Sequence, residues 1–129
     1  MMDSKVMADK IVNIIDDRKG KRIEQIEIKD ITVVTDYFVI ASGTSTTHVR
    51  GIADEVQFKM EQEGVKCAHI EGYETASWIL LDFLDVVVHI FLEEERQFYN
   101  IERLWRNGGS YRPKPQEPEG ENKQSDDNE

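Results

Sequence analysis

Two neighbouring apolar segments constrain the fold of this chain more than any other feature of its sequence. Val86–Leu92 is apolar except for one histidine and begins with three valines, and Trp78–Leu81 lies a few residues before it. Short apolar runs that are rich in β-branched residues are typical of buried strands. The segment Phe83–Asp85 can turn a hairpin between them, although Leu84 is a poor turn residue.

Helices are expected on both sides of this hairpin in the sequence. Ser4–Lys19 carries apolar residues at helical spacing, and Gly20 is expected to end this helix in the left-handed region. The capping residues of Ser42–Thr47 precede a second apolar stripe, which ends at Gly64. The three acids Glu93–Glu95 favour the start of a last helix, because its dipole attracts negative charge there. That helix would bury Phe98, Ile101, Leu104 and Trp105.

Three further segments are predicted as strands. Ile23–Ile28 alternates in its second half, Tyr37–Ala41 fits a central strand covered on both faces, and Val65–Ile70 is short. The order helix, strands, helix, strand, hairpin, helix predicts a mixed β-sheet packed with helices, in the mixed α/β class. We expect a single domain over residues 1–106. Residues 107–129 combine prolines, glycines and acids, as in a disordered acidic tail.

Composition excludes several classes of protein. The formal net charge is −10, whereas a free-standing DNA or RNA binder needs a basic face for phosphate contacts. Cys67 is the only cysteine, so no internal disulfide can form. The N-terminus is charged, and the most apolar stretch, Trp78–Leu92, contains two aspartates and a histidine. Neither a secretory signal nor a membrane span is therefore expected, and we expect a cytoplasmic protein.

Acidic residues are concentrated in one part of the predicted domain. Residues 1–106 carry 13 basic and 20 acidic residues, a net charge of −7. The window Cys67–Glu95 contains seven acids and neither lysine nor arginine, so its charge equals that of the whole domain. The same window contains the most apolar strands. Acids around apolar strands are typical of a docking face for a basic protein partner, so we expect this window to be the functional surface.

Some residues of this window also suggest other roles. Asp82 and Asp85 flank the predicted turn, where they could hold Mg²⁺ with a substrate phosphate or simply be solvated acids. Strand alternation places Trp78 on one face with Leu80 and Asp82, either as an interface anchor or as a core side chain. His89 lies in an apolar strand, which favours a hydrogen-bonded structural or interface histidine over a ligand or a base.

Two other patterns carry weaker signals. Gly43–Ser45 opens a helix after a strand and could cradle an anion, but no Walker lysine follows, which favours an ordinary capping turn. His48, His69 and His89 do not share a helix at i, i+4 spacing, so no metal site is predicted.

Several of these segments, taken in order, resemble a known family. Thr35–Ser45 followed by Ile52–Asp54 resembles the first signature of the ribosomal silencing factor (RsfS, Iojap-like) family. Glu71–Gly72, followed by Trp78–Asp82 and Asp85–Phe91, resembles its second signature. Tyr99, Glu102, Leu104 and Trp105 look like its closing helix, so the resemblance extends over residues 5–106.

The resemblance implies a fold similar to nucleotidyltransferases but without their catalytic carboxylates. It implies a translational repressor, not an enzyme, that binds the large ribosomal subunit through its protein fourteen and sterically blocks association with the small subunit. It also implies a homodimer that needs no cofactor or metal. The alternative is a nucleotidyltransferase-like, Mg²⁺-dependent enzyme that uses Asp82 or Asp85.

Partner contacts are expected on the second signature, which overlaps the acidic window. The resemblance assigns binding of the ribosomal protein to Glu71, Gly72, Trp78, Leu80, Asp82, Asp85, Val87 and His89. The chain departs from the family pattern at Leu84, where family members usually have glycine before the aspartate. The turn and its contacts are therefore expected to differ here.

Overall fold

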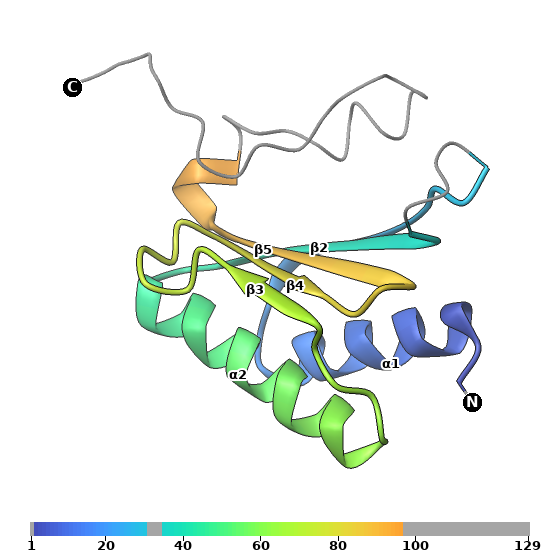
Figure 1. Cartoon of the computed structure of the whole chain (residues 1–129). Coiled ribbons are helices and arrows are strands. Elements are labelled where there is room, and N and C mark those ends of the chain that lie inside the picture. Colours follow the sequence, from blue (N-terminus) through green and yellow to red (C-terminus); the bar gives the residue numbers. More distant parts are fainter. Residues whose placement is uncertain (1, 31–34, 97–129) are drawn as a thin grey trace.

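Five strands form one mixed sheet in the computed structural model, which describes residues 2–30 and 35–96 (Figure 1). In spatial order the strands are β1 (Lys21–Glu27), β2 (Tyr37–Gly43), β5 (Val86–Leu92), β4 (Trp78–Asp82) and β3 (His69–Glu71). β2 and β5 are parallel, and the other neighbours are antiparallel. The predicted mixed α/β class and the predicted β4–β5 hairpin are confirmed.

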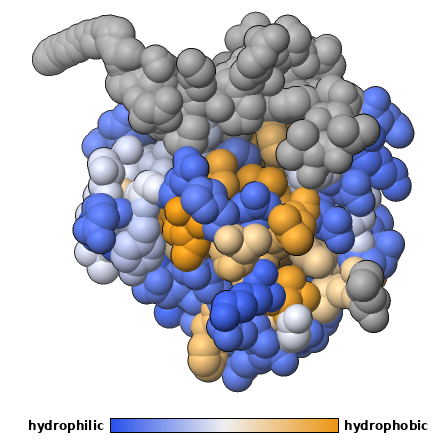
Figure 2. All heavy atoms as spheres, in the orientation of Figure 1, coloured by the Kyte–Doolittle hydropathy of each residue, from blue (hydrophilic) through white to orange (hydrophobic). Residues whose placement is uncertain are grey.

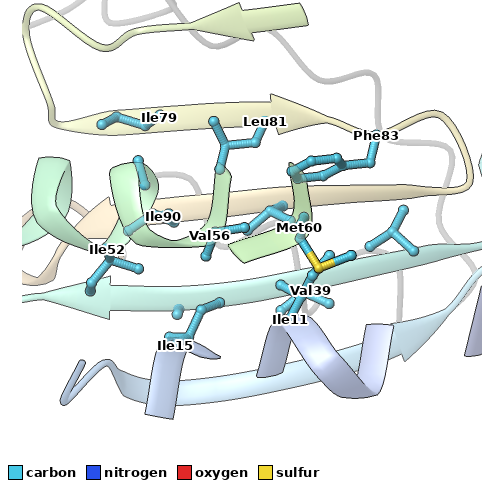
Figure 3. Close-up of a cluster of buried hydrophobic side chains, with 14 of the residues drawn as sticks. Ile11, Ile15, Val39, Ile52, Val56, Met60, Ile79, Leu81, Phe83 and Ile90 are labelled. Carbon is cyan, nitrogen blue, oxygen red and sulfur yellow. The ribbon is translucent and has the colours of Figure 1, made fainter. Parts of the chain in front are cut away.

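Two helices cover one face of this sheet (Figure 1). They are α1 (Ser4–Asp17) and α2 (Thr46–Gln62). Between helices and sheet lies the main core, whose side chains point toward one another from both layers (Figure 3). Full burial of each such aliphatic side chain stabilises the fold by about 1.5–3 kcal/mol. Its members include Ile11, Ile15, Val39, Ile52, Val56, Met60, Ile79, Leu81, Phe83 and Ile90.

The ends of the helices follow the capping rules, with one difference from prediction. Ser45 caps α2, because its Oγ accepts a hydrogen bond from the His48 backbone N–H at 3.0 Å. The prediction that Gly20 adopts the left-handed conformation is wrong: Lys19 does so, with φ 66°. Gly20 is needed for space instead, because a Cβ there would collide with the Ile15 side chain.

Strand β2 is buried along its whole length, as predicted for a central strand. The predicted strand Val65–Ile70 is wrong in its first part, because only His69–Glu71 pairs with β4. Residues 65–68 instead bring the chain from α2 to the sheet edge, where Val65 and Cys67 pack against the core.

The last predicted helix is described only at its start. Glu93–Glu95 form a short 3₁₀ helix, and Arg96 is buried beside it with Nη1 donating to Ser42 Oγ at 2.8 Å. Phe98, Ile101, Leu104 and Trp105 lie outside the described residues, and so do residues 107–129. Within the described residues no helix has the length and apolar character that crossing a membrane requires.

Candidate functional site

Strand register brings six of the predicted site residues onto the face of the sheet opposite α1 and α2, namely Glu71, Trp78, Leu80, Asp82, Val87 and His89. Leu80 faces His89, Trp78 faces Phe91 and Asp82 faces Val87 across the β4–β5 pair. Trp78, Val87 and Phe91 belong to a second buried cluster, separate from the helix-facing core, and Leu80 packs against it. We call this buried side of the sheet the aromatic face and define it by Phe38, Trp78, His89 and Phe91.

A hydrogen bond joins the two polar rings of the aromatic face. Trp78 Nε1–H donates to His89 Nδ1 at 3.0 Å. His89 also meets Phe38 edge to face, with 4.6 Å between ring centroids. Because Nδ1 accepts, the proton of the neutral imidazole is on Nε2, which has no hydrogen-bond partner among the residues that the structure describes.

Burial keeps His89 neutral. Its side chain is fully buried, and desolvation lowers its pKa from 6.5 to about 3. The hydrogen bond predicted for a structural or interface histidine is confirmed. Trp78 is only 2% exposed, so of its two interpretations the structure supports the core side chain. Val87 is buried on the same face.

The β4–β5 turn presents its acids to solvent in a fixed geometry. Asp85 is exposed, and Asp82 is half-buried with its Oδ1 accepting the Leu84 backbone N–H at 2.8 Å. The Asp85 carbonyl accepts the backbone N–H groups of Asp36 and Tyr37, at 3.0 and 3.2 Å. The turn is therefore tied both to its own strand and to the start of β2.

Glu71 and Gly72 lie at the other side of the site, at the end of edge strand β3. Glu71 faces Leu80 in the β3–β4 register, and its exposed carboxylate contacts His69 Nε2 at 2.8 Å. Gly72 has φ 81°, and a Cβ there would collide with the carbonyl oxygen of Trp78. Only glycine fits where the chain passes the start of β4.

A contact that the sequence did not reveal holds the β3–β4 loop to α2. Arg50 donates from Nε to the carbonyl of Tyr73 at 3.1 Å and from Nη2 to that of Glu74. Tyr73 Oη donates to both carboxylate oxygens of Asp54 at 3.1 Å, and this bond raises the pKa of Tyr73. Arg50 and Asp54 are one helical turn apart, but their partners in the loop cannot be read from helix spacing.

Six of the seven acids of the window form two groups in space, and the seventh, Glu71, lies on edge strand β3. Asp82 and Asp85 lie at the β4–β5 turn, whereas Glu74 and Glu93–Glu95 lie near the opposite end of the hairpin, where Leu92 N–H donates to the Ser77 carbonyl. The length of the seven-residue β5 separates the groups by about 20 Å. A partner patch of ordinary size, about 800 Å², is roughly 30 Å across and is therefore wide enough to contact both groups.

The turn Gly43–Ser45, which could cradle an anion, is engaged within the protein. Thr44 N–H, which would face an anion bound by Gly43–Ser45, donates to His48 Nδ1 at 2.9 Å. His48 Nε2 in turn contacts the Arg18 carbonyl at 2.8 Å. Residues 2–30 and 35–96 contain no cluster of three His, Cys, Asp or Glu side chains suited to a metal ion. The segment Gly43–Ser45 is therefore a capping turn, as predicted.

Comparisons with known proteins give consistent matches. A family model described as "Ribosomal silencing factor during starvation" (RsfS) matches residues 1–129. The chain is 38% identical over 104 residues to "Ribosomal silencing factor RsfS" of Halalkalibacterium halodurans, covering 81% of this chain and 89% of that one. It is 34% identical over 102 residues to the mouse "Mitochondrial assembly of ribosomal large subunit protein 1", covering 75% of this chain and 44% of that one.

A solved structure has a similar fold. The crystal structure of a Chromobacterium violaceum protein has a TM-score of 0.79 with this chain at 32% sequence identity. The match covers 93% of this chain and 98% of the other.

Proposed function

The chain belongs to the ribosomal silencing factor (RsfS) family, and on this premise we propose that it represses translation by binding the large ribosomal subunit and sterically blocking association with the small one. The family name itself ties the chain to the ribosome. The name of the mouse relative refers to the ribosomal large subunit, which favours that subunit as the partner. Following the resemblance, we propose protein fourteen of the large subunit as the direct contact.

The acidic β4–β5 hairpin is the observation that carries this proposal. Its turn presents Asp82 and Asp85, and neither lysine nor arginine occurs anywhere in Cys67–Glu95. Ribosomal proteins are basic as a class, so opposite charges would steer the two surfaces together, while bare ribosomal RNA would be repelled. Figure 2 shows apolar residues in the middle of one face of the molecule, with hydrophilic residues among and around them, and such mixtures are common in protein interfaces.

Burial divides the proposed binding residues into those that can contact a partner and those that support the contact surface from below. Glu71, Gly72 and Asp85 are exposed and Leu80 and Asp82 are half-buried, so these five can make the contacts. Trp78, Val87 and His89 are buried, and we assign them to holding the strands in register beneath the contact surface. We further propose a homodimer in the cytoplasm and a role without catalysis. The engaged capping turn at Gly43–Ser45 supports the last point.

A subunit-association experiment tests the proposed function. Purified large subunits are incubated with the protein, small subunits are added, and the joined ribosomes are quantified on a sucrose gradient. We expect the joined fraction to fall as the protein is titrated, with the protein remaining on the large subunit. Unchanged joining at saturating protein would overturn the proposal.

A further inference from the structure

Leu84 combines two features that are unfavourable in a folded protein. Its side chain is 64% exposed, the most among the large apolar residues that the structure describes. Its backbone has φ 76°, in the left-handed region that non-glycine residues rarely adopt. Glycine at this position would remove both features. A strained residue in a well-formed turn is a reason to look for a function.

The surroundings of Leu84 hold the turn in one conformation. Its own N–H is bonded to Asp82 Oδ1 at 2.8 Å, and Phe83 N–H donates to the Val86 carbonyl at 2.9 Å. Phe83 is buried in the main core, directly before the exposed leucine. Because the turn is already ordered, a partner that binds Leu84 has little backbone entropy left to remove.

We propose that Leu84 is an anchor residue that enters an apolar recess on the partner protein, with lysine or arginine side chains beside the recess pairing with Asp82 and Asp85. This inference rests on the proposed function and specifies the chemistry of the partner surface. The flanking carboxylates select a basic protein surface, because they would repel the phosphates of RNA. A side chain that is exposed before binding and enclosed afterwards is what an interface anchor requires.

A purely structural role of Leu84 and a role as an anchor predict opposite effects of its replacement on stability. If the leucine served the fold, its replacement by glycine or asparagine would lower the melting temperature. Because the side chain is largely exposed and the backbone is left-handed, we expect the reverse. The melting temperature of Leu84→Gly and of Leu84→Asn should stay equal or rise by a few degrees.

Binding and stability are therefore measured together on the full-length chain. The Kd for purified large subunits and the melting temperature are determined for wild type, Leu84→Gly, Leu84→Asn and Leu84→Met. We expect Leu84→Gly and Leu84→Asn to weaken binding by about ten- to a hundredfold. Leu84→Met keeps an apolar side chain and should bind within about threefold of wild type. Phe58→Ser, which removes an apolar side chain 59% exposed on α2, is the control and should bind as wild type does.

The outcomes separate this inference from the proposed function. If wild type binds large subunits and Leu84→Gly binds equally well, the anchor is wrong and the proposed function stands. A lower melting temperature of Leu84→Gly, or an equal loss of affinity in Leu84→Met and Leu84→Gly, would also overturn the anchor. If wild type itself does not bind large subunits, the proposed function fails and the inference fails with it.

Discussion

The indole N–H of Trp78 donates a hydrogen bond to Nδ1 of His89 across the β4–β5 hairpin, with 3.0 Å between the nitrogens. Both side chains are buried, so neither polar group can turn to water instead. The bond therefore fixes the pairing of the two strands, because a shift of one residue would place the partners on opposite faces. The two strands that flank the turn with Asp82 and Asp85 are held in place by this pair.

Trp78→Phe should destabilise the protein. The substitution leaves His89 Nδ1 buried without its donor, which costs about 1–3 kcal/mol. The melting temperature should fall by about 4–8 °C for each kcal/mol lost. Urea unfolding of Trp78→Phe, His89→Phe and the double variant measures the coupling between the two residues. Additive free energies in this cycle would contradict a stabilising bond.

Burial of His89 predicts a pH dependence of stability. Its pKa is 6.5 when unfolded and about 3 when folded, so between these values only the unfolded chain binds a proton here. Stability from this site is complete above pH 6.5 and is lost as the pH falls toward 3. His89→Asn keeps an acceptor for Trp78 without a titrating ring. Urea unfolding should show that the free energy of unfolding falls less between pH 8 and pH 5 for this variant than for wild type. Equal falls in the two proteins would show that His89 does not contribute to the pH dependence of stability.

Tyr73→Phe should loosen the β3–β4 loop without unfolding the domain. It removes the hydrogen bond to Asp54, whose net value is about 0.5–1.5 kcal/mol. Hydrogen exchange should become faster at Ala76, whose N–H donates to the Gly72 carbonyl at 2.9 Å. Asp54→Asn retains an acceptor and is the matched control. Unchanged exchange at Ala76 would contradict the role of this contact.

Nucleoside triphosphate with Mg²⁺ should leave the melting temperature unchanged. Thr44 N–H and Asp82 Oδ1 are already hydrogen-bonded within the protein, at 2.9 and 2.8 Å. An occupied nucleotide site must stabilise the folded state through linkage, so thermal unfolding is a direct measurement. A rise of several degrees that depends on both ligands would favour the nucleotidyltransferase-like alternative.

Sequence periodicity predicted the hairpin and the shared face of Trp78, Leu80 and Asp82, because strand alternation is a local property. It could not predict which residue of β5 each of them faces, since register depends on the turn. Leu84 illustrates the difference. Its unsuitability for a turn was visible in the sequence, whereas its φ of 76° and its exposure follow only from the folded hairpin.

The wrong prediction for Gly20 and the unpredicted contacts between α2 and the β3–β4 loop each have a physical cause. Gly20 was predicted to be left-handed because glycine is the usual residue there, but the helix ends early enough for Lys19 to take that conformation. The Arg50–Tyr73 and Tyr73–Asp54 bonds join α2 to a loop about twenty residues away. No periodic pattern reports such contacts.

The affinity of the acidic turn for the large subunit tests the central claim most directly. Asp82→Asn with Asp85→Asn removes two negative charges but keeps an oxygen that can accept the Leu84 N–H. Glu61→Gln with Glu63→Gln removes the same charge at the exposed end of α2 and is the matched control. We expect the first pair to weaken cosedimentation with large subunits at least tenfold, while the control pair binds as wild type does. Equal binding by both pairs would contradict docking through the β4–β5 hairpin.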